Sequence, residues 1–122
     1  MNIREKLEKG TLLFDGGIGT YLASLAGGPE NNPESYNIKD PALVAEVHRQ
    51  YIEAGADCIT ANTYALNRIV SKDDPENIKK SIIAGFSIAD KAAREAGAAA
   101  FASIGPAHGI HDNEIVDGEY IW

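Results

Sequence analysis

Short apolar runs alternate with helical patterns along this chain, and the alternation predicts its elements. Residues 11–15 (TLLFD), 57–64 (DCITANTY) and 98–106 (AAAFASIGP) are compact and largely apolar, and each run ends in or is followed by polar, glycine or proline residues. We therefore predict a strand in each of the three runs. Between them, apolar residues recur every three or four positions, which is the spacing of amphipathic helices.

The two longer predicted helices share one starting signal. Asp40-Pro41 and Asp74-Pro75 each place a capping carboxylate before a proline at the first helical position. Gly55 and Gly97 are predicted to end these helices. The apolar positions that mark the second helix are Ile78, Ile82, Phe86, Ala89 and Ala93.

The segments outside these elements give weaker patterns. Residues 2–9 predict a short helix that ends at Gly10, and residues 19–26 predict a second brief helix. Glycine, proline and asparagine recur through residues 26–37, so we predict a loop there. Residues 107–122 form a polar tail to which the pattern assigns no element.

The order of the elements predicts an α/β fold in which about three parallel strands are joined by right-handed helical crossovers. In such sheets, ligand-binding groups gather at the carboxyl ends of the strands. Three segments occupy those ends here: residues 15–17 (DGG), 62–64 (NTY) and 103–106 (SIGP). We therefore expect these segments to lie on one face of the protein and to form a site.

Asp15, Gly16 and Gly17 are the first candidate site residues. A carboxylate at a strand end can bind an ammonium group or act as a base, and glycine N–H groups can bind an anion. The alternative is that Asp15 caps the following helix and that the glycines form only a tight turn. The spacing G-G-x-G-T matches neither the dinucleotide fingerprint nor the P-loop, so the residues leave both interpretations open.

Asn62 and Thr63 are the second pair of candidates, because they present an amide and a hydroxyl at the next strand end. The alternative for this pair is hydrogen bonding between the strand end and the neighbouring loops. Cys58 lies early in the same strand, away from that end, and is interpreted as a buried and unreactive thiol.

The three histidines do not predict a metal centre. His108 and His111 have H-x-x-H spacing with acidic residues nearby, but this spacing outside a helix is poor evidence for metal ligands. His48 falls within the first amphipathic helix, where we interpret it as a surface or packing residue.

Composition narrows the class of protein further. A chain of 122 residues suits one small domain. The net charge of −7 with scattered basic residues argues against a nucleic-acid partner. Apolar runs stay below the ~20 residues of a membrane helix, which argues against a membrane partner. One cysteine and the absence of a signal-peptide pattern predict a cytoplasmic protein.

Three segments together resemble one known family. The stretches LLFDGGIGTYL, PALVAEVHRQYIEAGADCITANTY and FASIGP, within residues 12–106, are similar in order and spacing to the start of the homocysteine S-methyltransferase domain. That domain occurs in methionine synthases and in the betaine- and S-methylmethionine-dependent enzymes. The resemblance implies a (β/α)₈ barrel and methyl transfer to the homocysteine thiol, which gives methionine.

The resemblance also implies roles for the candidate residues. Asp15 looks like the carboxylate that faces the homocysteine amino group, and Gly16 and Gly17 look like the backbone that receives its amino-acid part. Asn62 and Thr63 look like part of the same pocket wall. In the family, zinc held by three cysteines binds the thiol and lowers its pKa, so that a thiolate attacks the methyl donor.

Other features depart from the family pattern. A complete barrel needs roughly 250 residues, and the family's zinc cysteines come from later strands, beyond Trp122. We therefore interpret residues 1–122 as an N-terminal portion that does not catalyse by itself and that self-associates through exposed sheet edges. The methyl donor stays open between cobalamin charged from methyltetrahydrofolate, S-methylmethionine, S-adenosylmethionine and betaine. The alternative function is a small non-catalytic ligand-binding or self-associating module.

Overall fold

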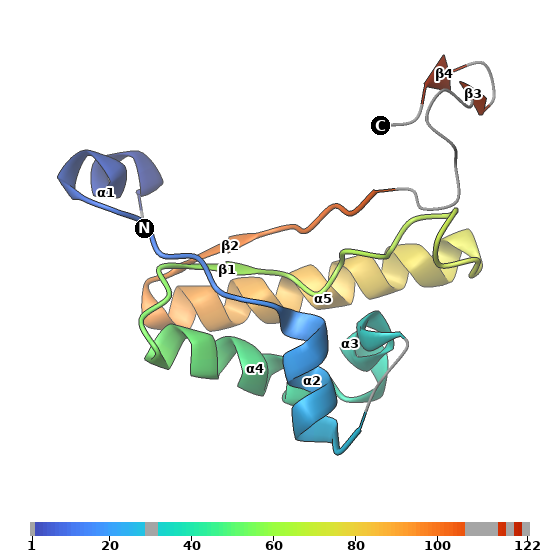
Figure 1. Cartoon of the computed structure of the whole chain (residues 1–122), viewed down its shortest axis with the longest axis horizontal. Coiled ribbons are helices and arrows are strands. Elements are labelled where there is room, and N and C mark those ends of the chain that lie inside the picture. The colour runs from blue at the N-terminus through green and yellow to red at the C-terminus, as the bar shows by residue number, and fades with distance from the viewer. Residues whose placement is uncertain (1, 29–31, 107–114, 117–118, 121–122) are drawn as a thin grey trace.

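The computed structural model describes residues 2–28, 32–106, 115–116 and 119–120 of the chain, and Figure 1 shows the arrangement of its elements. The helices are α1 (Ile3–Lys9), α2 (Ile18–Ala26), η1 (Pro33–Ser35), α3 (Tyr36–Lys39), α4 (Pro41–Glu53) and α5 (Pro75–Ala96). The strands are β1 (Cys58–Thr60), β2 (Ala99–Phe101), β3 (Ile115–Val116) and β4 (Glu119–Tyr120). His108 and His111 lie outside the described residues.

The predicted caps of the two longer helices are confirmed. The Asp40 carboxylate accepts the N–H of Leu43 at 3.1 Å, and the Asp74 carboxylate accepts the N–H of Glu76 at 2.9 Å. Each helix begins at the proline that follows. Gly97 ends α5 with a φ of 70°, in the left-handed region that glycine adopts without strain.

The parallel sheet is confirmed, but its regular strands are shorter than predicted. β1 pairs with β2 in parallel, with Cys58 opposite Ala99. Residues 11–15 contribute one parallel bridge, between Phe14 and Cys58, rather than a regular strand. The described elements therefore form part of an α/β sheet and do not close a barrel. In the tail, β3 and β4 form an antiparallel pair.

Residues 26–37 are not a loop throughout, which corrects the prediction made from their glycine, proline and asparagine content. Residues 33–39 form η1 and α3, with Pro33 at the first position of the 3₁₀ turn. Glu34 and Asn37 are buried there. Side-chain hydrogen bonds to residues 62–65, which follow β1, and to Ser81 of α5 thus order a segment whose composition is typical of loops.

One face of the sheet is covered by helices. Figure 1 shows α5 running beside β1 and β2, and α4 lies against α5 and also contacts β1. Ile59 and Ala61 pack against Ala89 and Ala93 of α5 in one core cluster. A second cluster joins Leu22 of α2 to α4. The helices therefore hold the carboxyl ends of the strands in place from one side.

The buried face of α5 includes Ile78, Ala89 and Ala93 from the predicted apolar positions, but Ile82 and Phe86 lie at its border. Ile82 and Phe86 are 37% and 38% exposed, whereas Ser81 and Gly85 are buried. A Cβ at Gly85 would lie 2.6 Å from the Asn37 amide nitrogen. Because α5 approaches α3 this closely, small residues occupy the contact and the larger apolar residues stay at its border.

Candidate functional site

The carboxylate of Asp15 is held by one residue of the neighbouring strand. Asp15 Oδ2 accepts the backbone N–H of Thr60 at 2.8 Å, and Oδ1 accepts the Thr60 hydroxyl at 2.9 Å. The N-cap of α2 is Gly17, and no side chain caps it. The alternative that Asp15 caps this helix is therefore wrong, because its carboxylate is bound across the sheet.

The surroundings of Asp15 act on its pKa in opposite directions. Partial burial raises the pKa of the carboxyl, because the charged form loses solvation. The two hydrogen bonds from Thr60 lower it, and the net shift is upward. The carboxylate therefore protonates at a higher pH than an ordinary aspartate does.

The glycine turn after Asp15 is bounded by Tyr51 of α4. The Tyr51 hydroxyl donates to the carbonyl oxygen of Gly17 at 2.9 Å. A Cβ at Gly16 would lie 2.9 Å from that hydroxyl oxygen. The ring also makes an edge contact with Tyr21, with centroids 5.5 Å apart. The turn thus needs glycine at position 16 because an aromatic side chain fills the space.

We expect Gly16→Ala to shift Tyr51 and loosen the turn. The added methyl group conflicts with the Tyr51 hydroxyl, so the protein should lose about 1–2 kcal/mol of unfolding free energy. Urea unfolding of the two proteins checks this. Gly10→Ala is the matched control, because a Cβ there meets nothing within 4 Å. Equal stability of Gly16→Ala and the wild type would contradict the packing argument.

Asn62 ties the end of β1 to the segment before α4. Its amide nitrogen donates to Pro33 O at 2.9 Å and to Asn37 Oδ1 at 3.0 Å. The Asn37 amide nitrogen returns a bond of 2.7 Å to the backbone oxygen of Asn62. Both side chains are buried. This pair of asparagines therefore fixes the residues after β1 against η1 and α3.

Thr63 links the residues that follow β1 to the residues that follow β2. Its hydroxyl donates to Ser103 O at 2.8 Å and accepts the N–H of Ser103 at 3.1 Å. The structure thus brings together the strand ends that the sequence predicts to meet. For Asn62 and Thr63 it also shows the hydrogen bonds to neighbouring segments that formed their alternative interpretation. Substrate contact by either residue stays a prediction.

Glu34 is a buried residue that the sequence analysis missed. Its side chain is almost fully enclosed, and Oε1 accepts the N–H of Ala65 at 2.9 Å. Its backbone oxygen accepts the hydroxyl of Ser81 at 3.3 Å. The only signal in the sequence is the preceding proline, which can begin a helical turn within a segment that otherwise reads as loop.

The described residues do not fit a zinc-thiolate site. Within residues 2–28 and 32–106, no three histidine, cysteine or acidic side chains gather as metal ligands. Cys58 is fully buried at the start of β1, and burial raises the pKa of its thiol. A zinc-bound cysteine needs the opposite shift. We therefore assign no step of the chemistry to zinc held by these residues.

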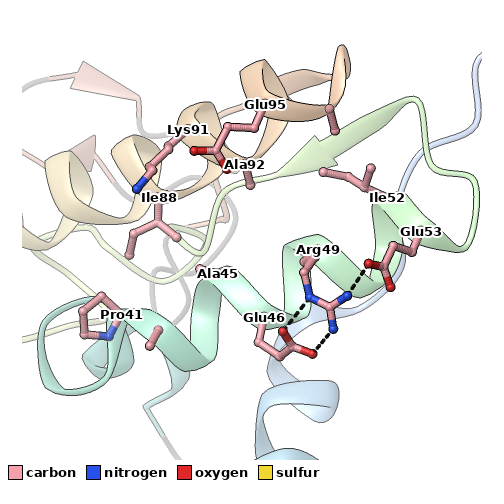
Figure 2. Close-up of a pocket in the computed structure, with 12 residues that line it drawn as sticks. Pro41, Ala45, Glu46, Arg49, Ile52, Glu53, Ile88, Lys91, Ala92 and Glu95 are labelled. Atoms are coloured by element: carbon pink, nitrogen blue, oxygen red, sulfur yellow. Dashed lines mark hydrogen bonds and ion pairs between the residues drawn. The ribbon is translucent and has the colours of Figure 1, made fainter.

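A groove of about 610 Å³ lies between α4 and α5, away from the strand ends. Figure 2 shows Arg49 between Glu46 and Glu53 on its α4 side. Hydrogen bonds from Arg49 and Gln50 hold the pKa of Glu46 down to about 2. The lining includes none of Asp15, Gly16, Gly17, Asn62 or Thr63, so this groove is separate from the candidate site.

None of the helices in the described segments is long and apolar enough to cross a membrane.

The class of protein follows from the fold and the site: an α/β protein that gathers a carboxylate and a glycine turn at the carboxyl ends of parallel strands. The chain belongs to the homocysteine S-methyltransferase family, because the sequence model of that family matches residues 12–120.

Individual relatives agree with this family. The chain is 34% identical over 92 residues to homocysteine S-methyltransferase 1 of Brassica oleracea var. italica, a match that covers 66% of this chain and 28% of that protein. It is 45% identical over 58 residues to homocysteine S-methyltransferase 1 of Zea mays, over 45% of this chain and 18% of that protein. The chain therefore spans less than a third of the length of these curated relatives.

Solved structures show the same fold. The metallated form of the homocysteine methyltransferase MmuM from Escherichia coli matches with a TM-score of 0.71 and 24% identity, over 85% of this chain and 41% of that one. The oxidised form of MmuM matches with a TM-score of 0.67 and 28% identity, over 85% and 40%. Most of the described chain thus has the arrangement found in part of that enzyme.

Proposed function

We propose that residues 1–122 carry the homocysteine-binding part of a homocysteine S-methyltransferase domain, as the N-terminal portion of a (β/α)₈ barrel. The reaction of such a domain moves a methyl group to the homocysteine thiol and gives methionine. One observation carries the proposal: the Asp15 carboxylate is anchored beside a glycine turn at the strand ends, within the segment that matches the family.

In this proposal the strand ends recognise the amino-acid part of homocysteine. Asp15 pairs with the ammonium group, and the N–H groups of Gly16 and Gly17 face the carboxylate. Asn62 and Thr63 form the wall beside them. The anchored carboxylate supports the first role, since a fixed anion binds a cation without first losing conformational freedom.

Methyl transfer itself is assigned to no residue of this chain. Zinc belongs to the proposed complete domain, and the methyl donor stays open between cobalamin charged from methyltetrahydrofolate, S-methylmethionine, S-adenosylmethionine and betaine. We propose that the chain by itself binds homocysteine without catalysis. A cytoplasmic location is also proposed, because a single cysteine suits a reducing compartment.

Titration of the chain with L-homocysteine, followed by ¹⁵N NMR, tests the proposed function. We expect the amide signals of residues 15–17 and 60–63 to shift on addition of homocysteine. The comparison ligand is γ-mercaptobutyrate, which has the thiol and the carboxylate but no ammonium group. It should bind far more weakly, because Asp15 then has no cation to pair with. Equal binding of the two ligands, or no binding of homocysteine, would reject the proposal.

A second candidate function, a self-associating module, is favoured by large apolar side chains that are exposed in and near the strands. Leu13, Phe14 and Ile104 are exposed by 55%, 47% and 92%. Within the described residues, the segment that carries Leu13 and Phe14 pairs with β1 on one side and has no strand on its other side. Apolar side chains next to an open strand edge form a template for pairing with a second chain.

Sedimentation velocity over a concentration series checks this self-association. We expect the wild type to form dimers or larger species as concentration rises, and Leu13→Lys to remain monomeric because a charge then lies next to the edge. Ile38→Lys is the matched control, since Ile38 is 60% exposed on α3. A wild type that sediments as a monomer throughout would rule out this function.

A further inference from the structure

We propose that Thr60 is a positioning residue, which holds the Asp15 carboxylate ionised and oriented toward the ammonium group of homocysteine. The inference rests on the proposed function of the strand ends and deepens it. It adds a residue to which the sequence analysis gave no site role.

Thr60 holds the Asp15 carboxylate by two hydrogen bonds, and these two bonds are called the Thr60 grip. The backbone N–H and the hydroxyl of Thr60 each take a different oxygen of Asp15, at 2.8 and 2.9 Å. Two bonds to two oxygens fix the plane of a carboxylate, whereas one bond leaves it free to rotate. The parallel bridge between Phe14 and Cys58 sets the register that brings these two residues together.

The grip is not needed to join the two segments. Asp15 N already donates to Cys58 O at 2.9 Å, and Cys58 N donates to Leu13 O at 3.1 Å. These backbone bonds hold residues 13–15 beside β1 without the side chains. The bonds from Thr60 to the carboxylate therefore act on the orientation and charge of Asp15 itself.

The remaining capacity of the carboxylate matches the proposed ligand. An ionised carboxylate has about four acceptor positions, and Thr60 occupies two of them. The others remain for the donors of an ammonium group. Hydrogen bonds to the charged form favour ionisation, so the Thr60 bonds counter the rise in the pKa of Asp15 that burial causes.

Among the described residues, the titratable side chains of Tyr51 and Cys58 interact with Asp15, and neither titrates in the acid range. The Tyr51 hydroxyl of α4 and the Cys58 thiol of β1 both have pKa values raised chiefly by burial, with a smaller contribution from the Asp15 charge. Both groups are neutral when the Asp15 carboxyl gains its proton. The acid titration of this site therefore reports on Asp15.

The test uses Thr60→Val and Thr60→Ser in the full chain, with Thr11→Val as the matched control. Thr11 is an exposed threonine at the first position of residues 11–15, the segment that ends at Asp15. Valine keeps the shape and the backbone N–H but removes the hydroxyl, and serine restores it. Two quantities are measured: the dissociation constant for L-homocysteine, and the pKa of Asp15 from its ¹³C carboxyl shift.

We expect Thr60→Val to weaken homocysteine binding about tenfold, because the Asp15 carboxylate then loses its fixed orientation and must be ordered when the ligand binds. The pKa of Asp15 should rise in the same variant. Thr60→Ser and Thr11→Val should resemble the wild type in both quantities. A merely structural threonine would not change the Asp15 titration, and a serine variant would not rescue it.

The failure of each proposal is recognised separately. If the wild type binds homocysteine and Thr60→Val binds it equally well, or leaves the pKa of Asp15 unchanged, the role of Thr60 is rejected and the proposed function stands. If the wild type does not bind homocysteine, the proposed function fails, and the role of Thr60 toward that ligand fails with it. The carboxyl titration then decides whether Thr60 holds Asp15 ionised.

Discussion

Asp15→Asn is expected to reduce the affinity of the chain for L-homocysteine by about 100-fold, since it removes the charge that pairs with the ammonium group. The amide also fits the Thr60 grip poorly. Thr60 presents two donors to two oxygens, and asparagine offers one oxygen and one donor. The substitution thus removes the charge and disturbs the orientation together.

A matched carboxylate elsewhere on the sheet serves as the control for this experiment. Asp57 lies at the other end of β1, where it pairs with Lys6 and accepts the N–H of Leu13. Asp57→Asn removes the same charge from the protein without touching the strand ends. We expect it to bind homocysteine as the wild type does. An equal loss in both variants would show that net charge, rather than Asp15, governs binding.

The second large effect is expected from His48, whose burial makes stability depend on pH. The side chain is fully enclosed, and neither ring nitrogen has a hydrogen-bond partner among the described residues. Burial lowers its pKa from 6.5 to about 4, because the charged form loses its solvation. The unfolded chain binds this proton near pH 6.5, and the folded chain resists it until about pH 4.

The sign of the effect follows from this difference. The unfolded state binds more protons across that interval, so stability is greatest above pH 6.5 and falls as the pH drops toward 4. The loss contributed by His48 amounts to about 3 kcal/mol. Urea unfolding at a series of pH values measures it, with His48→Leu as the comparison.

The leucine variant isolates this contribution from the acidic residues. Leucine removes both unpartnered nitrogens and keeps an apolar side chain, so stability near pH 7 should be retained or improved. The difference between the two stability curves should then grow as the pH falls toward 4. Parallel curves would show that His48 gains its proton in the folded state as readily as in the unfolded one.

Much of the fold could be predicted from local chemistry. The two Asp-Pro starts and the parallel arrangement of the strands are confirmed. These features depend on neighbours in sequence or on a general rule of sheet connection. The meeting of the strand ends follows from the same rule. The lengths of the strands could not be predicted, because beyond the backbone bond from Ala61 to Phe101 the side chains of Asn62 and Thr63 bond to distant segments.

The candidate site was also predictable only in part. Asp15 and the glycines stand out in the sequence because a carboxylate and a glycine turn rarely end an apolar run without cause. The partner of Asp15 could not be predicted, since the bond to Thr60 depends on strand register. Glu34 was missed because its segment has the composition of a loop.

By itself, the sequence determined the family, the order of the elements, their caps and the residues at the strand ends. Only the tertiary structure decided which positions of α5 are buried at its contact with α3 and what holds Asp15. Gly85 rather than Phe86 faces α3 because the two helices approach to a distance that no Cβ fits. Caps and periodicity act over a few residues, whereas burial and hydrogen-bond partners depend on segments that are distant in the chain.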